Sequence, residues 1–398
     1  MKRKMTSGIM AMVVVLVGGA LAETNMIITH FGANGEISVS NLWTNASCRV
    51  EWRSSLTAGE WMRSWQTLDR KDTGTNTTQT FKVPMFYRVV MTVSDEPSGM
   101  ALVDAGSFRM GDTYAEGNAD ELPVHEVYAG AFWIDRYEVT KAQWDVVRDW
   151  GLTNGYVDLP SGGGGLRASP PGYRDEPDHP LTGTTWNDCV KWCNARSEMH
   201  VLTPVYYTSA GQTTVYRTGT VDLASSFVDW DAKGYRLPTE AEWEKACRGG
   251  RDGHHFPWPS FGGNWSSHIE RTTANYYGSG DPSEGDGDGT TRIGYYNGAQ
   301  QVTNETGAVL AQSDMANGYG LYDMAGNLYE WCWDRYSSNY YTVAPSTNPR
   351  GPDTGSNRVC RGGSYFYVSN GMRCSQRGRY EPLFYYTQSG TFRCVRRP

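Results

Sequence analysis

The long stretch from Arg248 to Glu330 constrains the fold of this chain more than any other feature. It is rich in Gly, Asp, Asn and Tyr, and we interpret it as one long loop. Loops longer than about 12–15 residues are uncommon in compact domains and are usually functional or stabilised from outside. The whole chain has 46 Gly and 13% aromatic residues, which favours a loop-rich α+β protein over a helical bundle.

The N-terminus has the pattern of a secretory signal peptide. Lys2, Arg3 and Lys4 precede the apolar run Ile9–Leu16, and Ala20–Ala22 has the small-x-small spacing of a cleavage site. The run is short for a bilayer span, and a buried N-terminal helix would leave the cationic flank unexplained. We therefore expect residues 1–22 to be removed and the protein to be secreted or periplasmic, with no membrane span.

Charge and cysteine content narrow the possible partners and the compartment. The chain carries 36 Lys and Arg against 43 Asp and Glu, and removal of the leader makes the balance more acidic. The sequence has no basic cluster, so we do not expect nucleic acid as a partner. Eight cysteines in an exported chain favour disulfide bonds.

We expect two folded parts joined by a short linker. Residues 23–92 contain alternating segments separated by turn-rich stretches, which is typical of a small antiparallel β module. Residues 93–99 are expected to form a linker, and residues 100–398 to form one larger domain. Within that domain, capping boxes predict helices that begin after Thr140, Thr185 and Thr239.

A series of sequence words in the larger domain resembles the formylglycine-generating enzyme family, also called sulfatase-modifying factors. The words follow the family order: "FRMGD" (108–112), "FWIDRYEVTKAQW" (132–144), "TTWNDCVKWC" (184–193), "GYRLPTEAEWEKACRGG" (234–250), "NGYGLYDMAGNLYEW" (317–331), "RGGSY" (361–365) and "GTFRC" (390–394). The resemblance covers Met100 to Pro398. It implies an irregular variant of the C-type lectin-like fold, with little regular secondary structure and with bound calcium.

The resemblance also implies a catalytic copper site, and this chain departs from it. The family enzymes oxidise a sulfatase cysteine to Cα-formylglycine, using oxygen and copper held by two thiolates, the soft ligands that Cu(I) prefers. The first cysteine follows "RGGSY" by two residues and the second by five more, where this chain has Tyr367 and Met372. Cys374 is the only cysteine between Cys360 and Cys394, so we expect neither copper binding nor a catalytic residue here.

Two disulfide bonds are implied by the resemblance, Cys193–Cys394 and Cys247–Cys374. Spacing alone leaves the connectivity of these four cysteines open. Each bond would close a loop of more than about 100 residues and would stabilise the fold by roughly 4–5 kcal/mol on the chain-entropy account.

The other cysteines are assigned from their positions. Cys332 and Cys360 flank a segment that could form a hairpin, so we expect a third, weaker pair. Cys189 lies one helical turn before Cys193 and is expected to serve as a small buried hydrophobe. Cys48 has no cysteine partner within its own module.

Two oxygen-rich stretches match the calcium sites that the resemblance implies. Hard cations take six to eight oxygen ligands, and glycine turns can direct backbone carbonyls toward them. The alternative is ordinary Asx-turn chemistry, in which Asp and Asn bond their own backbone. The predicted ligands are Asp323, Gly326, Leu328 and Glu330 at a first site, and Asn275, Tyr276, Asp286 and Asp288, with a register uncertain by two residues, at a second.

Other motif-like segments carry less information. His254 and His255 are adjacent, diverge on most backbones and have no nearby Cys or His partner for a metal. "SGGGGL" (161–166) lacks the Gly-Lys-Ser of a phosphate loop. We interpret both as turns.

The segment after "RGGSY" has the composition of a binding surface. Tyr and Phe provide large contact areas at low conformational cost, and Ser and Asn provide adaptable hydrogen bonds. A blander explanation is that aromatic residues are frequent throughout this chain. The predicted ligand-binding residues are Ser364, Phe366, Tyr367, Ser369, Asn370, Tyr380, Phe384, Tyr385 and Tyr386.

Three functions are compatible with these features. We favour an exported family member without oxidase activity that binds a peptide, protein or glycan in the former active-site groove. The first alternative is an active formylglycine-generating oxidase. The second is a ligand-binding protein diversified by a retroelement, because such variable proteins resemble this family and vary in their last segment after a "GGS" word.

Overall fold

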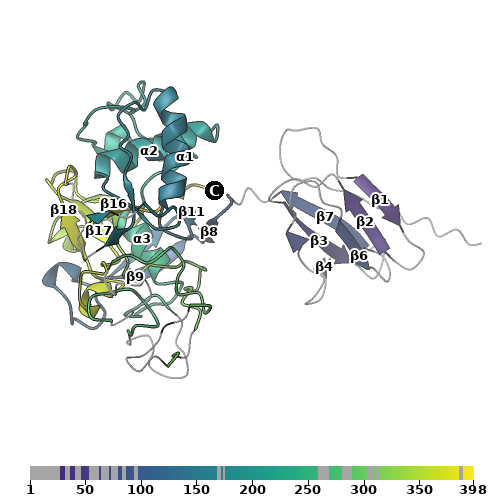
Figure 1. Cartoon of the computed structure of the whole chain (residues 1–398). Helices are drawn as coiled ribbons and strands as arrows, with labels where there is room; N and C mark the ends of the chain where they lie inside the picture. The colour runs from purple at the N-terminus through teal and green to yellow at the C-terminus, as the bar shows by residue number, and fades with distance from the viewer. Residues whose placement is uncertain are drawn as a thin grey trace, which may run out of the picture. The chain divides into compact units, whose positions relative to one another are not determined.

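The computed structural model divides the chain into two compact units, residues 1–98 and 99–398 (Figure 1). The structure describes residues 97–398 except 168–171, 174, 259–268, 280–288, 301, 303–307, 311–312 and 385–388. Before residue 97 it describes only the backbone of seven strands. Within these described parts of the chain, no helix is long and apolar enough to cross a membrane.

The first unit is built from antiparallel strands. One sheet has the order β1-β2-β6, and in the other β3 pairs with β4, β5 and β7. Cys48 lies in β3, opposite Lys71 and Met91. The strands are β1 Ile27–Phe31, β2 Glu36–Ser40, β3 Ala46–Trp52, β4 Met62–Arg63, β5 Lys71–Asp72, β6 Gln79–Lys82 and β7 Tyr87–Val93.

The second unit contains several small sheets. Its two main sheets have the orders β20-β11-β8 and β18-β17-β16-β19, and only the β16–β19 pair in these two sheets is parallel. The hairpin β9–β10 and the short pairs β12–β15 and β13–β14 form three separate two-stranded sheets. The strands are β8 Met100–Val103, β9 Gly106–Met110, β10 His125–Ala129, β11 Phe132–Asp135, β12 Gly163–Gly164, β13 Leu166–Arg167, β14 Gly172–Tyr173, β15 Leu181–Thr182, β16 Tyr329–Arg335, β17 Arg358–Arg361, β18 Gly378–Tyr380, β19 Ser389–Thr391 and β20 Val395–Arg396.

Three α-helices begin where the capping boxes predict. They are α1 Lys141–Thr153, α2 Trp186–Met199 and α3 Glu240–Cys247, with Thr140, Thr185 and Thr239 as their N-caps. In each box the threonine hydroxyl accepts a hydrogen bond from the backbone N–H of the third helical residue. The side chain of that third residue accepts a hydrogen bond from the backbone N–H of the threonine. The predicted helix starts are confirmed.

Irregular segments make up much of the remainder. Between α3 and β16 the described residues form no α-helix and no β-strand of their own. Four short 3-10 helices occur among the described residues: η1 Ala119–Glu121, η2 Ser225–Phe227, η4 Tyr340–Thr342 and η5 Ser369–Met372. The predicted loop-rich α+β class is confirmed.

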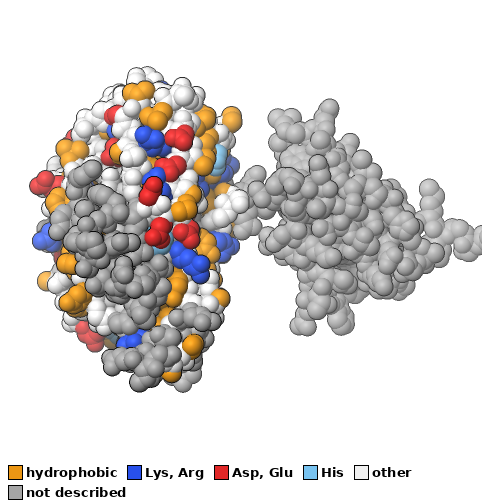
Figure 2. Space-filling model, in the orientation of Figure 1, with side chains coloured by type: hydrophobic (Ala, Val, Ile, Leu, Met, Phe, Trp, Pro, Cys, Tyr) orange, Lys and Arg blue, Asp and Glu red, His pale blue; other side chains and the backbone are white. Residues whose placement is uncertain are grey.

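Aromatic packing joins α1 and α2, which lie side by side at one end of the second unit (Figure 1). The Trp144 and Trp192 rings stack at 5.7 Å and 3°, and Phe392 packs edge-on against both. Such stacked and edge-to-face arrangements match the ring quadrupoles. On the face drawn in Figure 2, acidic and basic side chains are interspersed over this unit rather than gathered by sign.

Buried ion pairs hold the last segment, residues 361–393, to the rest of the unit. Arg373 pairs with Glu121 of η1, Arg377 and Arg361 pair with α3, and Arg393 pairs with Glu330 of β16. The Arg377 Nε and Nη2 atoms lie 2.7 and 2.9 Å from the two carboxylate oxygens of Glu240. Buried pairs of this kind fix geometry more than they add stability, because desolvation offsets much of the attraction.

Glu244 of α3 gives the clearest stability test. Its carboxylate is fully buried, accepts from Arg248 and Arg361, and also accepts from the Gly111 N–H at 2.8 Å. Burial alone would raise the pKa of Glu244, but Arg248 and Arg361 outweigh it and hold the pKa below its usual value.

We predict that Glu244→Gln lowers the free energy of unfolding by about 3–5 kcal/mol, since it leaves buried guanidinium charge without its partner. Asp231→Asn is the control, because Asp231 is 92% exposed and pairs with the surface residue Arg397. It should change stability little. Urea unfolding of both variants checks this, and equal effects would contradict the assigned importance of the buried pair.

Candidate functional site

A tight glycine turn positions the segment that follows "RGGSY". Gly363 has φ +76°, and a Cβ there would lie 2.4 Å from Met372 Cε and 2.6 Å from the Gly371 oxygen. Only glycine fits this backbone conformation and this close approach. Arg361, fully buried just before the turn, donates to the carbonyls of Ser375 and Cys374 at 2.7 and 3.1 Å. The turn and Arg361 thus fix both ends of one compact loop.

Seven side chains define what we call the aromatic surface: Tyr277, Phe366, Tyr367, Val368, Tyr380, Leu383 and Phe384. The first four and Leu383 are 39–60% exposed, whereas Tyr380 and Phe384 are half-buried. Large apolar side chains that gather at the surface of a soluble domain commonly mark an interaction site.

Direct contacts hold the aromatic surface together. The Tyr277 N–H donates to the Tyr367 carbonyl at 2.9 Å, and the Tyr277 and Phe366 rings lie 6.4 Å apart. The hydroxyls of Tyr367 and Tyr380 lie 3.0 Å apart, and Tyr380 stacks on Phe384 at 5.2 Å. Burial, together with the hydrogen bond to Tyr367, raises the pKa of Tyr380, so this phenol stays neutral.

The structure places the other predicted ligand-binding residues in different settings. Ser369 and Asn370 lie in η5, and Arg373 Nε donates to the Asn370 carbonyl and side-chain oxygens at 3.1 and 2.8 Å. Ser364 is fully buried, and its hydroxyl accepts from the Phe366 N–H. The prediction that Ser364 contacts a ligand is therefore wrong, because its oxygen stabilises the turn below the surface. Tyr385 and Tyr386 lie outside the described residues.

The two positions that carry copper cysteines in the resembling enzymes differ from each other in this chain. Tyr367 is exposed on the aromatic surface, whereas Met372 is fully buried against Phe256 and Trp258. Neither side chain can supply a thiolate. Cys374, two residues beyond Met372, is buried and contacts Cys247.

The cysteines predicted to pair by resemblance are neighbours in the structure. The sulfur atoms of Cys193 and Cys394 lie 3.6 Å apart, and those of Cys247 and Cys374 lie 3.4 Å apart. All four are buried thiols here. Their positions match the prediction, and the covalent bonds remain predictions.

The proposed Cys332–Cys360 pair is wrong. In the β16–β17 ladder Cys360 lies opposite Trp331, and a bulge follows. Cys332 packs with Val359 in one apolar cluster, while Cys360 packs with Trp331 in another. Side chains of successive strand residues point to opposite faces, so the two thiols face away from each other. Cys189 is fully buried, and burial raises the pKa of its thiol, in keeping with a structural role.

The first predicted calcium site contains a residue that the sequence analysis missed. Both Glu330 oxygens are engaged by Arg393 at 2.6 and 2.7 Å, and one also accepts from Trp243 Nε1. Glu138, in contrast, is fully buried, and its Oε1 has no hydrogen-bond partner among the described residues. Its other oxygen accepts from Asn327 at 2.7 Å. The signal in the sequence was a glutamate within the aromatic-rich "FWIDRYEV" word.

The charges around this site favour a cation. Burial raises the pKa of Glu138 well above its usual value, and Asp323 and Glu330 add to the effect. Burial also raises the pKa of Asp323 to about 6. Outside the strand ladders, no backbone hydrogen bond between described residues ends on the carbonyl of Gly326 or Leu328. The carboxylates of Asp323 and Glu138 and the two carbonyls are therefore suitable ligands for a hard cation. Glu138 would then supply the carboxylate that was predicted to come from Glu330.

The second predicted calcium site is described only in part. Asn275 Nδ2 donates to the Gly289 carbonyl at 2.8 Å, and the Asn275 carbonyl accepts from the Asn327 N–H at 2.9 Å. Tyr276 follows Asn275 in the same loop, whereas Asp286 and Asp288 lie outside the described residues. The Asn275–Asn327 bond links the loops of the two predicted sites.

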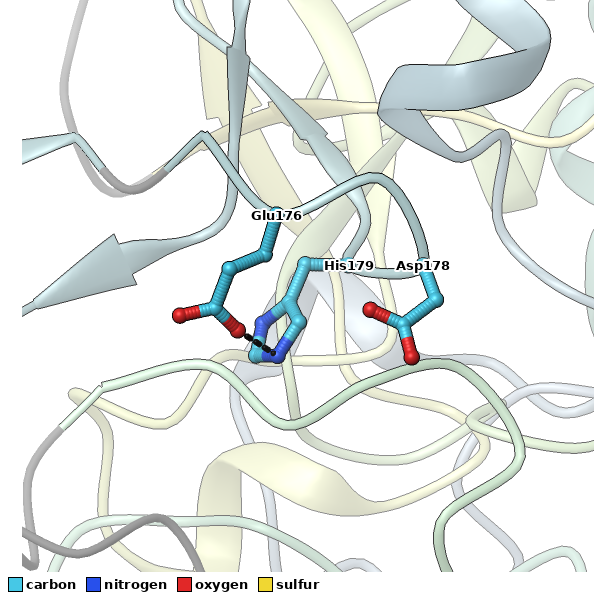
Figure 3. A group of neighbouring side chains, drawn as sticks. All are labelled: Glu176, Asp178 and His179. Atoms are coloured by element: carbon cyan, nitrogen blue, oxygen red, sulfur yellow. Dashed lines mark ion pairs between the residues drawn. The ribbon is translucent and has the colours of Figure 1, made fainter.

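A group of Glu176, Asp178 and His179 also brings possible metal ligands within 4.8 Å of one another (Figure 3). Figure 3 shows the Glu176 carboxylate directed at the imidazole, with His179 Nε2 at 2.7 Å from Glu176 Oε2. Nδ1 lies 3.1 Å from Thr290 Oγ1, so both ring nitrogens are engaged. A Cβ on Gly165 would collide with this ring, so the end of the glycine run packs closely against His179. The interpretation of the whole run as a turn is corrected, because Gly163–Gly164 form β12 and pair with β15.

Comparisons with known proteins agree with this fold. The structure of Treponema denticola variable protein 1 is 25% identical, with a TM-score of 0.50, and the match covers 75% of this chain and 95% of that one. Few helices, several small sheets and this neighbour define a formylglycine-generating-enzyme-like variant of the C-type lectin-like fold, which confirms the predicted fold class.

The family follows from the sequence comparisons. The family model "Sulfatase-modifying factor enzyme 1-like domain" matches residues 87–398, and the chain belongs to this family. The formylglycine-generating enzyme of Thermomonospora curvata is 30% identical over 307 residues, covering 67% of this chain and 82% of the enzyme. Serine/threonine-protein kinase pkn1 of Chlamydia pneumoniae is 28% identical over 337 residues, covering 79% of this chain but only 41% of the kinase.

Oxidation should link the two neighbouring thiol pairs. We predict that protein exported to an oxidising compartment yields peptides cross-linked between Cys193 and Cys394 and between Cys247 and Cys374. No peptide should link Cys332 to Cys360, because their side chains face opposite sides of the sheet. Non-reducing peptide mass spectrometry tests the pairing, and any other connectivity would contradict it.

Calcium should stabilise the second unit in a pH-dependent manner. Because the pKa of Asp323 is raised from 3.8 to about 6 in the folded state, the folded state binds a proton more tightly, and cation-free stability falls as pH rises from the lower value to the higher one. We therefore predict that calcium raises the melting temperature more at pH 7.5 than at pH 5. Differential scanning fluorimetry measures the shift.

Matched variants locate the predicted ion. Asp323→Ala and Glu138→Gln should each remove most of the calcium-induced shift, because they delete carboxylates at the first site. Asp178→Ala removes a carboxylate beside His179 and should leave the shift intact. A shift that depends on Asp178 and not on Asp323 would contradict this assignment.

Proposed function

We propose that this protein is an exported, calcium-stabilised binding protein that does not generate formylglycine. Its aromatic surface binds a peptide, protein or glycan. One observation carries the proposal: the two positions that hold copper thiolates in the resembling enzymes are an exposed tyrosine, Tyr367, and a buried thioether, Met372. Export rests on the leader pattern of residues 1–22.

Preorganisation of the loop supports ligand binding. The loop after Gly363 is held by Arg361 and Arg373, whose guanidinium groups are buried in ion pairs. A rigid loop loses little conformational entropy when a ligand binds, and exposed rings supply apolar contact area. A catalytic loop without its copper-binding thiolates would have no comparable reason to display Phe366 and Val368 to solvent.

A second candidate is a ligand-binding protein diversified by a retroelement. The similarity to a structure entitled "Treponema denticola variable protein 1" favours it, together with the aromatic and small polar residues after the "GGS" word. A near-identical repeat of this segment beside the gene, differing at adenines, would support this candidate. Sequencing that finds no such repeat removes it.

An exposed valine on the aromatic surface allows a matched test of binding. We predict that Val368→Asp weakens any ligand selected on the wild-type protein by at least about tenfold, since a charge replaces apolar contact. Val146→Asp is the control, because Val146 on α1 is similarly exposed, at 63% against 59%. Selection from a displayed peptide library and a glycan array, followed by calorimetry on the three proteins, measures this.

Two outcomes would contradict the proposal. Ligands that bind Val368→Asp and wild type equally would place the binding site elsewhere. Aldehyde formation on a Cys-x-Pro-x-Arg peptide incubated with copper and this protein would establish oxidase activity instead.

A further inference from the structure

A cavity of about 270 Å³ lies next to the aromatic surface, at the N-terminus of α2. Its lining includes Trp186, Asn187, Thr220, Arg335, Arg358 and Leu383. The Trp186 N–H donates to the Pro382 carbonyl at 3.1 Å, so the segment that carries Leu383 and Phe384 borders both the cavity and the surface. One ligand could therefore contact both.

Arg358 is the unusual residue of this cavity. It is 2% exposed, yet it forms no ion pair with any described carboxylate. Its Nη atoms donate to the Trp333 and Leu223 carbonyls at 2.7 and 3.0 Å, and its Nε has no partner among the described residues. The guanidinium carbon lies 3.8 Å from the centre of the Trp186 ring. A buried charge without a counter-ion is costly, and a cation–π contact offsets only part of that cost.

Two further features make the cavity attractive to an anion. It lies at the positive end of the dipole of α2, and neither the backbone N–H nor the Nδ2 of Asn187 donates to a described residue. Arg335 also lines the cavity and forms an ion pair with Asp222, whose side chain is 79% exposed. Asp222 is the one carboxylate among the described residues of the lining. Cationic groups thus outnumber anionic ones around this space.

The protonation of Arg358 is consistent with a missing partner. Burial, followed by the neighbouring charge of Arg335, lowers the pKa of Arg358 to about 9. An anion in the cavity would reverse both effects by supplying a counter-charge.

We propose that this cavity binds the carboxylate of an acidic residue in a peptide ligand, while apolar residues next to it contact the aromatic surface. The inference rests on the proposed binding function and specifies its ligand. A peptide is favoured over a glycan because Leu383 and Val368, 55% and 59% exposed, gain from aliphatic contacts and gain nothing from sugar hydroxyls. The carboxylate would accept hydrogen bonds from the backbone N–H and Nδ2 of Asn187 and would be attracted by the positive charges of Arg335 and Arg358.

A surface variant tests the charge preference without disturbing the buried arginine. Thr220 lines the cavity and is exposed, so Thr220→Glu places a competing carboxylate at its mouth. Thr218→Glu is the control, because Thr218 is also exposed and does not line the cavity. The probes are the N-acetylated dipeptide amides Phe-Glu and Phe-Gln, which differ only in the carboxylate.

Calorimetric titration should show Phe-Glu binding to wild type and to Thr218→Glu at least about tenfold more tightly than Phe-Gln. Thr220→Glu should abolish that difference. Equal binding of the two probes to wild type, or an unchanged preference in Thr220→Glu, would overturn the inference. The inference would also be overturned if the protein distinguished a uronate disaccharide from its neutral analogue but bound the two dipeptides equally.

The two proposals fail in different ways. If Val368→Asp weakens a selected ligand and Thr220→Glu does not, the aromatic surface binds ligands but the cavity takes no carboxylate. If Thr220→Glu weakens binding of the selected ligand and Val368→Asp does not, the cavity binds the carboxylate and the aromatic surface is not the binding site.

Discussion

The pairing of buried arginines with buried glutamates is the interaction on which the rest of the structure depends. Arg361, Arg373 and Arg377 enter the interior from one short stretch of chain and meet Glu244, Glu121 and Glu240, which come from η1 and α3. A guanidinium offers donors in a fixed plane, so each pair defines an orientation as well as a distance. In a unit with few regular elements, these pairs fix the course of the loops.

That constraint explains how the segment after "RGGSY" can differ so much from the enzymes it resembles. The turn at Gly363 and the flanking ion pairs fix the backbone independently of the side chains displayed between them. The displayed residues can then be thiolates that hold copper or aromatic groups that contact a ligand. In this chain they are aromatic, and the neighbouring cavity adds positive charge close by. The scaffold is therefore separable from the chemistry it presents.

The features predictable from the sequence are local or belong to the family pattern. The three helices were predictable because a capping box is a contact within four residues, at Thr140, Thr185 and Thr239. The proximity of Cys193 to Cys394 followed from the family resemblance. The wrong Cys332–Cys360 pair arose because a strand register and its bulge are set by partners far along the chain. Glu138 was missed, and the burial of Ser364 was not predicted, because burial depends on packing between segments far apart in the sequence.

The most direct measurement is a titration of the folded, reduced protein with Cu(I) in competition with a chromophoric chelator, observed by X-ray absorption at the copper edge. The account predicts that the protein retains no copper in competition with the chelator and that no copper–sulfur scattering is observed. Tyr367 and Met372 occupy the thiolate positions, and the sulfur atoms of Cys247 and Cys374 are buried in contact with each other. Stoichiometric copper bound by two sulfur ligands would contradict it and would support the alternative of an active formylglycine-generating oxidase.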